Sequence, residues 1–474
     1  MSRTKIVATI GPQTGTAESI RALAGEGMSV ARLNGSHGTL PWHAEVIHLL
    51  RLTVPDIPIL LDVPGRKIRT GTLTADVPFG VGDEIRFTTD LEQPAHGSIP
   101  LNRDDVHEAI MPGMRILADD GTIALVVTGV RGREIVCRAE VRGVLGSAKG
   151  INIPGMRLSD DLFTARDRQL LAFAHAQAVD FVGISFVESA AHVRAARELI
   201  GGKWPQVLAK IETKRGVDHL EEIVAEADAI MIDRGDLSTD VGLENLGIVQ
   251  KHILQVARHA GKAAIVATEM LHTMITNHVP TKAEVTDITN AVLDGCAATM
   301  LSGETAVGVY PVDAVRMMRD VVASAERHLQ TTLDDANVKD RSHVPEVTAE
   351  AIAMICRLLP VTKIVAVTRQ GYAARTIAAR QPRQPILAVS NDPQAARSFN
   401  LLPGTEGVFV EMSFDRASTD HVLVALRELW RRGKLESDDM VLVTALAYPK
   451  SGNRMNLLQT HVVGDLIEAL SWQH

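Results

Sequence analysis

The stretch 207–237 reads VLAKIETKRGVDHLEEIVAEADAIMIDRGDL and contains two short apolar runs that end in charged residues. The first run stops at Lys210-Ile211-Glu212 and the second at Arg234-Gly235-Asp236. Apolar runs followed at once by ionisable side chains indicate buried parallel strands whose C-terminal ends open onto a site. Helical spacing over 217–227 separates them, so this stretch predicts a strand, a helix and a second strand.

Three charged side chains of this stretch are expected to meet. Lys210 and Glu212 flank Ile211, so both point to one face of their strand. Asp236 adds a carboxylate from the neighbouring strand. Two carboxylates with open coordination positions suit Mg²⁺ or Mn²⁺, and the Lys210 ammonium would meet negative charge that develops on a bound substrate. A structural ion pair at the rim of a barrel is the alternative interpretation.

Composition narrows the class of protein. A chain of 474 residues is too long for one core and predicts two or three domains. A net charge of -8 and only 3% aromatic residues argue against a nucleic-acid partner. The 3 cysteines are far apart and indicate neither disulfides nor a zinc site. No signal segment or long apolar run is found, so we expect a cytoplasmic protein without a membrane partner.

Strand-like runs alternate with helical stretches over most of the first 330 residues. They lie near residues 5, 30, 58, 182, 207, 230, 264 and 299, and polar clusters follow them. This alternation predicts a parallel sheet with right-handed crossovers. A set of 8 such runs indicates a closed (β/α)₈ TIM barrel with its active site at the C-terminal face.

Two further regions interrupt or follow this pattern. Residues 72–150 show short β runs with turn signals, which indicate an all-β domain inserted after the third strand as a lid. We therefore predict an α/β fold with a catalytic barrel of residues 1–71 and 151–330. A polar linker over 330–344 leads to an open C-terminal α/β domain of residues 345–474.

The order of motifs closely resembles the pyruvate kinase family. The motifs are TKIVATIGP, GMSVARLNGSHG, LLDVPGRKIRTG, DDG, KGINIPG, KIETKRG, MIDRGDL, ATEMLHTM, PTKAEVTDITNAVLDG and MLSGETAVGVYP. The resemblance implies transfer of the phosphoryl group of phosphoenolpyruvate to ADP, giving pyruvate and ATP, with Mg²⁺ or Mn²⁺ as cofactor. It also implies a barrel, a β lid, a C-terminal regulatory domain and a homotetramer.

Site residues follow from the same resemblance, motif by motif. It implies that Glu212 and Asp236 hold the metal ion and that Lys210, Thr268 and Arg32 are catalytic. Thr268 would take part in protonating the enol carbon, through a relay of Ser302 and Glu304. The substrate would be bound by Gly235, Asp236, Thr268 and Lys210, and the nucleotide by Arg32, Asn34, His37, Arg69 and Lys149. Arg32 paired with Asp62, and Thr268 as a strand-end hydroxyl, are the structural alternatives.

Two departures from the family pattern change the expectations. Lys67 stands where the family usually has a glutamate that helps to place K⁺ near Asn34, Ser36, Asp62 and Val63. Since an ammonium is itself a fixed monovalent charge, we predict that K⁺ is not required. Asp233 stands where alanine is usual. It would pair with Arg234 or a neighbouring subunit, or indicate another substrate.

Two other functions remain open at this point. A metal-dependent lyase or aldolase acting on a 2-oxo acid also places carboxylates at the mouth of a barrel, but it does not explain the lid. A catalytically weak paralogue that binds metabolites would fit Asp233 and the altered C-terminal loop 368–374, although Lys210, Glu212, Asp236 and Thr268 argue against it.

Overall fold

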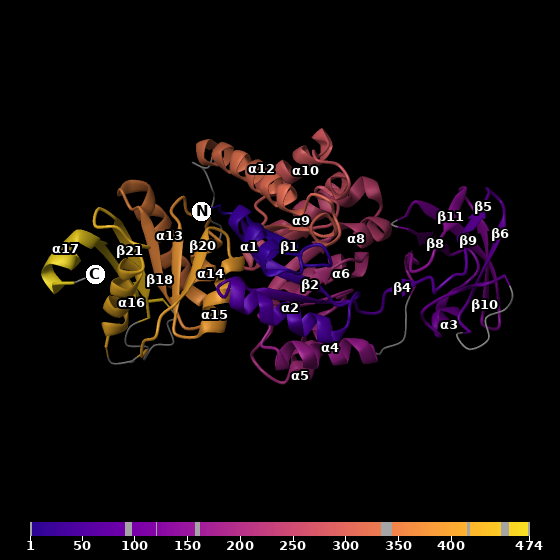
Figure 1. Ribbon diagram of the computed structural model, residues 1–474, viewed down its shortest axis with the longest axis horizontal. Coiled ribbons are helices and arrows are strands. Elements are labelled where there is room, and N and C mark those ends of the chain that lie inside the picture. The colour runs from indigo at the N-terminus through magenta and orange to yellow at the C-terminus, as the bar shows by residue number, and fades with distance from the viewer. Residues whose placement is uncertain are drawn as a thin grey trace.

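The computed structural model describes residues 2–90, 97–119, 121–156, 162–332, 344–414, 418–446 and 455–472. Three bodies follow one another along its long axis (Figure 1). The C-terminal sheet with its helices lies at one end, the barrel in the middle, and a β domain at the other end. Within these ranges, no helix is both long enough and apolar enough to cross a membrane.

The central body is a closed barrel of parallel strands in the order β1-β17-β16-β15-β14-β13-β3-β2. This confirms the predicted (β/α)₈ barrel. Buried runs of valine, isoleucine, leucine and alanine form the strands because both strand faces are covered. Their bounds are β1 Lys5–Thr9, β2 Met28–Asn34, β3 Ile59–Val63, β13 Phe181–Ile184, β14 Gln206–Ile211, β15 Ala229–Asp233, β16 Ala263–Ala267 and β17 Ala298–Leu301.

Helices with one apolar face surround the barrel. They are α1 Ala17–Glu26, α2 Leu40–Thr53, α4 Ala165–Ala176, α5 Ala190–Ile200, α7 Leu220–Glu226, α9 Leu246–His259, α10 Lys282–Leu293 and α12 Pro311–Thr332. Shorter elements fill the loops: α6 Lys214–Asp218, α8 Arg234–Val241, η1 Leu243–Asn245, η2 His272–Ile275 and α11 Gly303–Ala306. Thr164 and Thr281 form capping boxes that fix where α4 and α10 begin.

The sequence prediction was wrong at two boundaries near the site. The helix predicted over 217–227 is two helices, α6 and α7, which meet at His219. Gly216 in α6 packs so closely that a β carbon would lie 2.7 Å from the Val187 carbonyl oxygen. In addition, β15 ends at Asp233, so the residues Arg234 to Asp236 form the first turn of α8 and not the end of the strand.

The inserted region forms a seven-stranded sheet in the order β4-β12-β8-β9-β10-β6-β7 and a separate β11-β5 pair. The strands are β4 Ile68–Arg69, β5 Val77–Phe79, β6 Glu84–Thr88, β7 Ile99–Pro100, β8 Arg115–Ala118, β9 Ile123–Arg131, β10 Glu134–Ala139, β11 Gly143–Leu145 and β12 Gly150–Asn152, with the short helix α3 Val106–Ala109. Because β4 pairs with β12, both connections to the barrel belong to this sheet.

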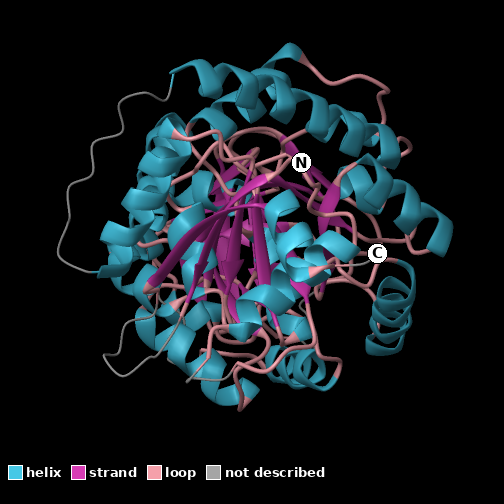
Figure 2. Ribbon diagram, turned by 90° about the vertical axis from the view of Figure 1, so that its left-hand side faces the viewer, coloured by secondary structure: helices cyan, strands magenta, loops and turns pink. Residues whose placement is uncertain are grey.

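The C-terminal body is a sheet of order β20-β19-β18-β21-β22 between two layers of helices (Figure 2). Its strands are β18 Lys363–Val367, β19 Ile386–Ser390, β20 Thr405–Phe409, β21 Met440–Ala445 and β22 Leu457–Val462. Its helices are α13 Val344–Leu358, α14 Tyr372–Ala378, α15 Pro393–Ser398, η3 Phe399–Leu401, α16 Asp420–Arg431 and α17 Val463–Leu470. The linker predicted over 330–344 lies mostly outside the described residues.

One buried acid joins the C-terminal body to the N-terminal end of the barrel. Asp180, directly before β13, accepts hydrogen bonds from Arg51 at 2.7 Å and from the Ile59 amide at 2.8 Å. Its other oxygen accepts from Arg397 of α15 at 3.0 Å. Both oxygens of this fully buried carboxylate are therefore satisfied by the protein.

Candidate active site

A polar cleft of roughly 770 Å³ opens at the C-terminal end of the barrel. It lies at the ends of several barrel strands, where active sites of this fold are found. The structure brings most of the predicted site residues together here. The lining residues are Arg32, Asn34, Ser36, Asp62, Pro64, Lys67, Arg69, Ser185, Phe186, Lys210, Glu212, Asp233, Gly235, Asp236, Thr268, Glu269 and Ser302.

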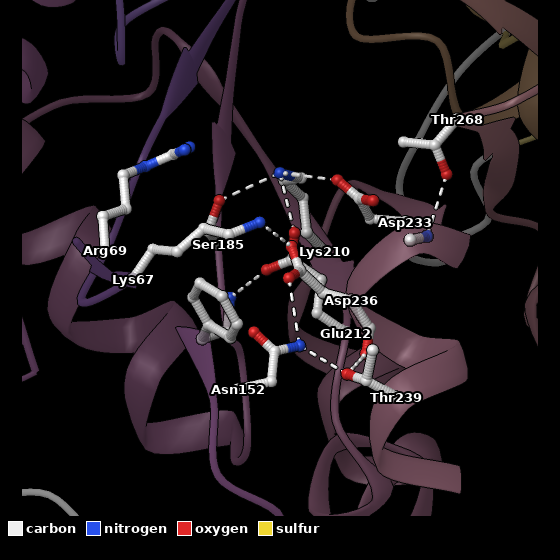
Figure 3. A network of polar contacts seen from close by, with 12 residues as sticks. Lys67, Arg69, Asn152, Ser185, Lys210, Glu212, Asp233, Asp236, Thr239 and Thr268 are labelled. Atoms are coloured by element: carbon white, nitrogen blue, oxygen red, sulfur yellow. Dashed lines mark hydrogen bonds and ion pairs between the residues drawn. The ribbon is translucent and has the colours of Figure 1, made fainter. Parts of the chain in front are cut away.

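The ammonium of Lys210 is the centre of this cleft (Figure 3). It lies 2.8 Å from Glu212 Oε1, which confirms that both side chains leave β14 on the same face. It also lies 3.4 Å from Asp62 Oδ2 and donates to Ser185 Oγ at 3.0 Å. Burial lowers the pKa of Lys210, but the surrounding carboxylates outweigh this effect and hold that pKa well above its usual value. Lys210 is therefore a fixed positive charge.

Asp233 points into the cleft, and the expectation that it pairs with Arg234 is wrong. Asp233 Oδ2 lies 3.2 Å from Lys210 Nζ. Arg234 is buried beside the cleft and does not line it, with Nη1 2.6 Å from Asp287 Oδ2 and Nη2 donating to the Thr268 carbonyl. The cause is the boundary between β15 and α8, because the last strand residue faces the barrel interior and the first helical residue does not.

The carboxylates of Glu212, Asp233 and Asp236 form a buried group suited to a divalent ion. One oxygen of each lies within 4.8 Å of the others. Burial, together with the charges of Asp233 and Asp236, raises the pKa of Glu212 to about 8, although Lys210 opposes this. Burial also raises the pKa of Asp233, but Lys210 and Lys67 outweigh it and lower that pKa. Crowded, hard oxygen donors fit Mg²⁺ or Mn²⁺.

Lys67 contacts the predicted metal site. Its Nζ lies 2.7 Å from Asp236 Oδ2. Burial lowers the pKa of Lys67, but the charge and hydrogen bond of Asp236, together with the charges of Asp233 and Glu212, more than offset this and raise that pKa. Of the residues predicted around a monovalent ion, Asn34 ends β2, Asp62 and Val63 end β3, and Ser36 lies in the loop after β2. Asn34 Oδ1 accepts from the Ser36 amide, and the Val63 carbonyl accepts from the Ser185 amide.

Thr268 lies at a strained point of the backbone after β16. Its φ is 70°, a left-handed conformation that a β-branched residue rarely adopts. This conformation places Thr268 Oγ1 to accept from the Gly235 amide at 3.0 Å and to donate to the Ala267 carbonyl at 2.6 Å. Such strain is typical of functional sites. In the relay predicted through Ser302 and Glu304, Ser302 lines the cleft, and Glu304 accepts from the amides of Leu271 and Ser302.

Residues predicted to bind the nucleotide form a less compact group. Arg32 is paired with Asp62 at 2.6 Å, the structural alternative noted above, yet it still lines the cleft. Arg69 also lines the cleft and donates to the Ala148 carbonyl. Burial, Arg69 and Arg32 lower the pKa of His37. Lys149 pairs with Asp119 on the β domain at 2.8 Å and is not part of the cleft lining.

Four polar residues of the site were missed by the sequence prediction of roles. Ser185 accepts from Lys210, and Glu269 lines the cleft beside Thr268. Asn152 of β12 donates to Asp236 Oδ1 at 3.3 Å and bonds Thr239 of α8. The position of Ser185 directly after a predicted strand was the available signal, whereas the Asn152 contact depends on how the two domains meet.

Two family models match this chain, one in its first 315 residues and one in its C-terminal body. A family model described as "Pyruvate kinase, barrel domain" matches residues 1–315, and one described as "Pyruvate kinase, alpha/beta domain" matches residues 346–461. A pyruvate kinase of Corynebacterium efficiens is 35% identical, covering 98% of this chain and 98% of the relative. One of Mycobacterium intracellulare is 36% identical, covering 98% of this chain and 99% of the relative.

A third relative extends the comparison to another bacterial group. A pyruvate kinase of Bacillus licheniformis is 34% identical over 98% of this chain and 81% of its own length. These matches confirm the predicted family and the predicted class of enzyme, a phosphotransferase. On the matches of both domain models and of these full-length relatives, the chain belongs to the pyruvate kinase family.

Proposed function

We propose that this chain transfers the phosphoryl group of phosphoenolpyruvate to ADP, giving pyruvate and ATP, at the C-terminal mouth of the barrel. The observation that carries the proposal is the buried Lys210 ammonium 2.8 Å from Glu212, beside a second and a third carboxylate. Phosphoryl transfer needs positioning and charge stabilisation more than covalent chemistry. A fixed cation and a carboxylate metal site provide both.

Each residue then has a chemical task. Glu212 and Asp236 hold Mg²⁺ or Mn²⁺, which would neutralise charge on the substrate oxygens when bound. Lys210 stabilises the negative charge of the phosphoryl group and of the enolate. The amides of Gly235 and Asp236, in the first turn of α8, bind the substrate carboxylate together with the Thr268 hydroxyl.

The outer part of the cleft is assigned to the nucleotide and to proton transfer. Arg32 and Arg69 bind phosphate oxygens through their planar guanidinium groups, with Asn34, His37 and Lys149 on the nucleotide side. Thr268 takes part in protonating the enol carbon. The Thr268 hydroxyl donates a hydrogen bond to the Ala267 carbonyl, so it must rotate before it can take part in proton transfer to the substrate.

The decisive test is formation of pyruvate and ATP from phosphoenolpyruvate and ADP with Mg²⁺. The exchange Lys210→Met should lower kcat by about 10²–10³-fold or more, since it removes a preorganised charge from the transition state. Lys214→Met is a matched control, because Lys214 is exposed and pairs with Asp218 outside the cleft. A 2-oxo-acid lyase or a catalytically weak paralogue would give no ATP in the unmodified protein.

We further propose that the enzyme does not require K⁺, because Lys67 supplies a fixed positive charge within the cleft. Activity in buffer free of Na⁺ and K⁺ should rise less than about twofold when K⁺ is added, whereas Lys67→Glu should become dependent on K⁺. Lys203→Glu is the control for the charge change, since Lys203 lies outside the cleft and pairs with Asp392. Strong activation of the unmodified enzyme by K⁺ would contradict this proposal.

We further propose that the protein forms a homotetramer in the cytoplasm. The exposed face of α13 carries Val347, Met354 and Leu358 at helical spacing, and β22 is an edge strand of its sheet. Exposed apolar stripes and sheet edges are surfaces that subunits use to associate. The cysteines Cys137, Cys296 and Cys356 are free and buried, which fits a reducing compartment.

A further inference from the structure

Asp233 is the one carboxylate of the buried group that the proposed mechanism leaves without a task. Asp233 is the last residue of β15, and its carboxylate lies between those of Glu212, directly after β14, and Asp236, in the first turn of α8. One oxygen of each lies within 4.8 Å of the others, and all three side chains are buried. Ligands around Mg²⁺ lie about 3 to 4 Å from one another when metal–oxygen distances are about 2.1 Å. A small contraction would therefore bring all three onto one ion.

Lys210 does not neutralise Asp233 by itself. The Lys210 ammonium is shared, because Glu212 at 2.8 Å and Asp62 at 3.4 Å compete with Asp233 at 3.2 Å for the same charge. Figure 3 shows the Asp233 carboxylate directed at this ammonium from the side opposite Ser185. The buried site thus holds more negative charge than its central lysine can balance, which favours binding of a further cation.

Lys67 also affects the charge at the predicted metal site. Its ammonium lies 2.7 Å from Asp236 Oδ2, while Asn152 donates to Asp236 Oδ1. Both oxygens of Asp236 are therefore engaged, and a positive charge stands next to one of the two acids assigned to the metal. Glu212 is engaged as well, by Lys210 at Oε1 and by the Phe186 amide at Oε2. Glu212 and Asp236 alone would therefore hold a divalent ion weakly.

We propose that Asp233 is a third carboxylate ligand of the divalent ion and that it compensates for the charge that Lys67 places on Asp236. The substrate side of this inference rests on the proposed function. Without the ion, Asp233 would repel the carboxylate of phosphoenolpyruvate from the amide of Gly235 and the hydroxyl of Thr268. With the ion bound, that repulsion is neutralised, so the metal binds before the substrate.

Binding of Mn²⁺ to the full-length protein, followed by the electron paramagnetic resonance signal of free Mn²⁺, tests this without substrate or nucleotide. Asp233→Asn should raise the Mn²⁺ Kd by about tenfold or more, since affinity follows the number of charged ligands. Asp233→Ala should raise the Mn²⁺ Kd at least as much, because alanine also lacks the amide oxygen with which asparagine could still bind the ion. Glu221→Gln, which removes an exposed acid on α7, is the control and should leave the Kd unchanged.

Lys67 gives an independent arm of the experiment. Lys67→Met should tighten Mn²⁺ binding several-fold, because the competing charge on Asp236 is gone, and Lys67→Met combined with Asp233→Asn should return the Kd to within about threefold of the unmodified protein. Circular dichroism and melting temperature confirm that each variant is folded.

The result that overturns the proposal is an unchanged or lower Mn²⁺ Kd in both Asp233 variants, or an unchanged Kd in Lys67→Met. These measurements contain neither phosphoenolpyruvate nor ADP. A protein that makes no pyruvate, which would refute the proposed function, could therefore still show the three-carboxylate pattern. An active enzyme with unchanged Mn²⁺ affinity in the Asp233 variants would refute this inference alone.

Discussion

The two ends of the barrel treat buried charge in opposite ways. At the N-terminal end, both oxygens of the fully buried Asp180 accept hydrogen bonds, which come from Arg51, Arg397 and the Ile59 amide. At the C-terminal end, one Glu212 oxygen lies within 4.8 Å of oxygens of Asp233 and Asp236, and Glu212 shares the Lys210 ammonium with Asp233 and Asp62. The first arrangement is electrostatically complete and the second is not.

This difference separates structural from functional charge. A buried carboxylate with its partners in place resists change, because removal of one partner leaves another charge unpaired. Buried carboxylates that are crowded together raise the energy of the folded protein until a ligand neutralises them. Burial, together with the charges of Asp233 and Asp236, accordingly raises the pKa of Glu212 to about 8. The N-terminal end of a TIM barrel is expected to serve stability and the C-terminal end catalysis.

The largest effect is expected at the crowded end. Glu212→Gln should lower kcat by about a thousandfold, which corresponds to about 4 kcal/mol of transition-state stabilisation. It should change the free energy of unfolding by less than about 1 kcal/mol, because lost repulsion from Asp233 and Asp236 offsets the lost contact with Lys210. Steady-state kinetics and urea unfolding of the same preparation measure both. A loss of stability as large as the loss of activity would break the comparison.

The complete end should show the reverse pattern. Asp180→Ala leaves the guanidinium groups of Arg51 and Arg397 without their carboxylate and should lower the free energy of unfolding by about 3 kcal/mol. The folded fraction should retain its kcat. Glu198→Ala on the exposed face of α5 is the control and should stay within about 0.5 kcal/mol of the unmodified protein. Equal unfolding curves for Asp180→Ala and the control would show that this buried acid is not structural.

A smaller effect is expected from His192 on α5, which is buried against Phe163. Burial and the charge of Arg66 lower the pKa of His192 to about 4, so the folded protein holds it neutral. The unfolded chain takes up a proton below about pH 6.5. Stability from this residue is therefore complete above about pH 6.5 and falls as the pH drops toward 4, by about 2 kcal/mol at pH 5.

The variant His192→Asn isolates that contribution. Urea unfolding at pH 7.5 and pH 5 should show a smaller loss of stability in this variant than in the unmodified protein, because its side chain does not titrate. Equal losses in the two proteins would assign the acid sensitivity to other groups, such as Asp233, where burial raises the pKa but the charges of Lys210 and Lys67 outweigh this effect and lower that pKa.

The fold was predictable from the sequence because its signals are local. Apolar runs such as Ala263–Ala267 and Ala298–Leu301 coincide with β16 and β17, and parallel strands place the residues that follow them at one end of the barrel. The spacing of Lys210 and Glu212 likewise sufficed to put both on one face of β14. These inferences need only the two-residue period of a strand.

The electrostatic details were not predictable, because they depend on boundaries and on distant segments. One residue decides whether Asp233 or Arg234 faces the cleft, and element boundaries are the least certain part of any sequence prediction. The partner of Lys67 is Asp236, 169 residues further along the chain. No local pattern reports such a contact, since it forms only when the β domain is seated on the barrel.

Each of the two connections between the barrel and the β domain contributes a residue that bonds Asp236. Lys67 lies just before β4, where the chain leaves the barrel, and Asn152 lies at the end of β12, where it returns, and each bonds Asp236. A ligand that binds both oxygens of Asp236 must therefore weaken its contacts with Lys67 and Asn152. By reciprocity, a β domain that moves away from the barrel must change the affinity of Asp236 for that ligand. We expect the angle between the two bodies in solution to differ between chelator and millimolar Mg²⁺.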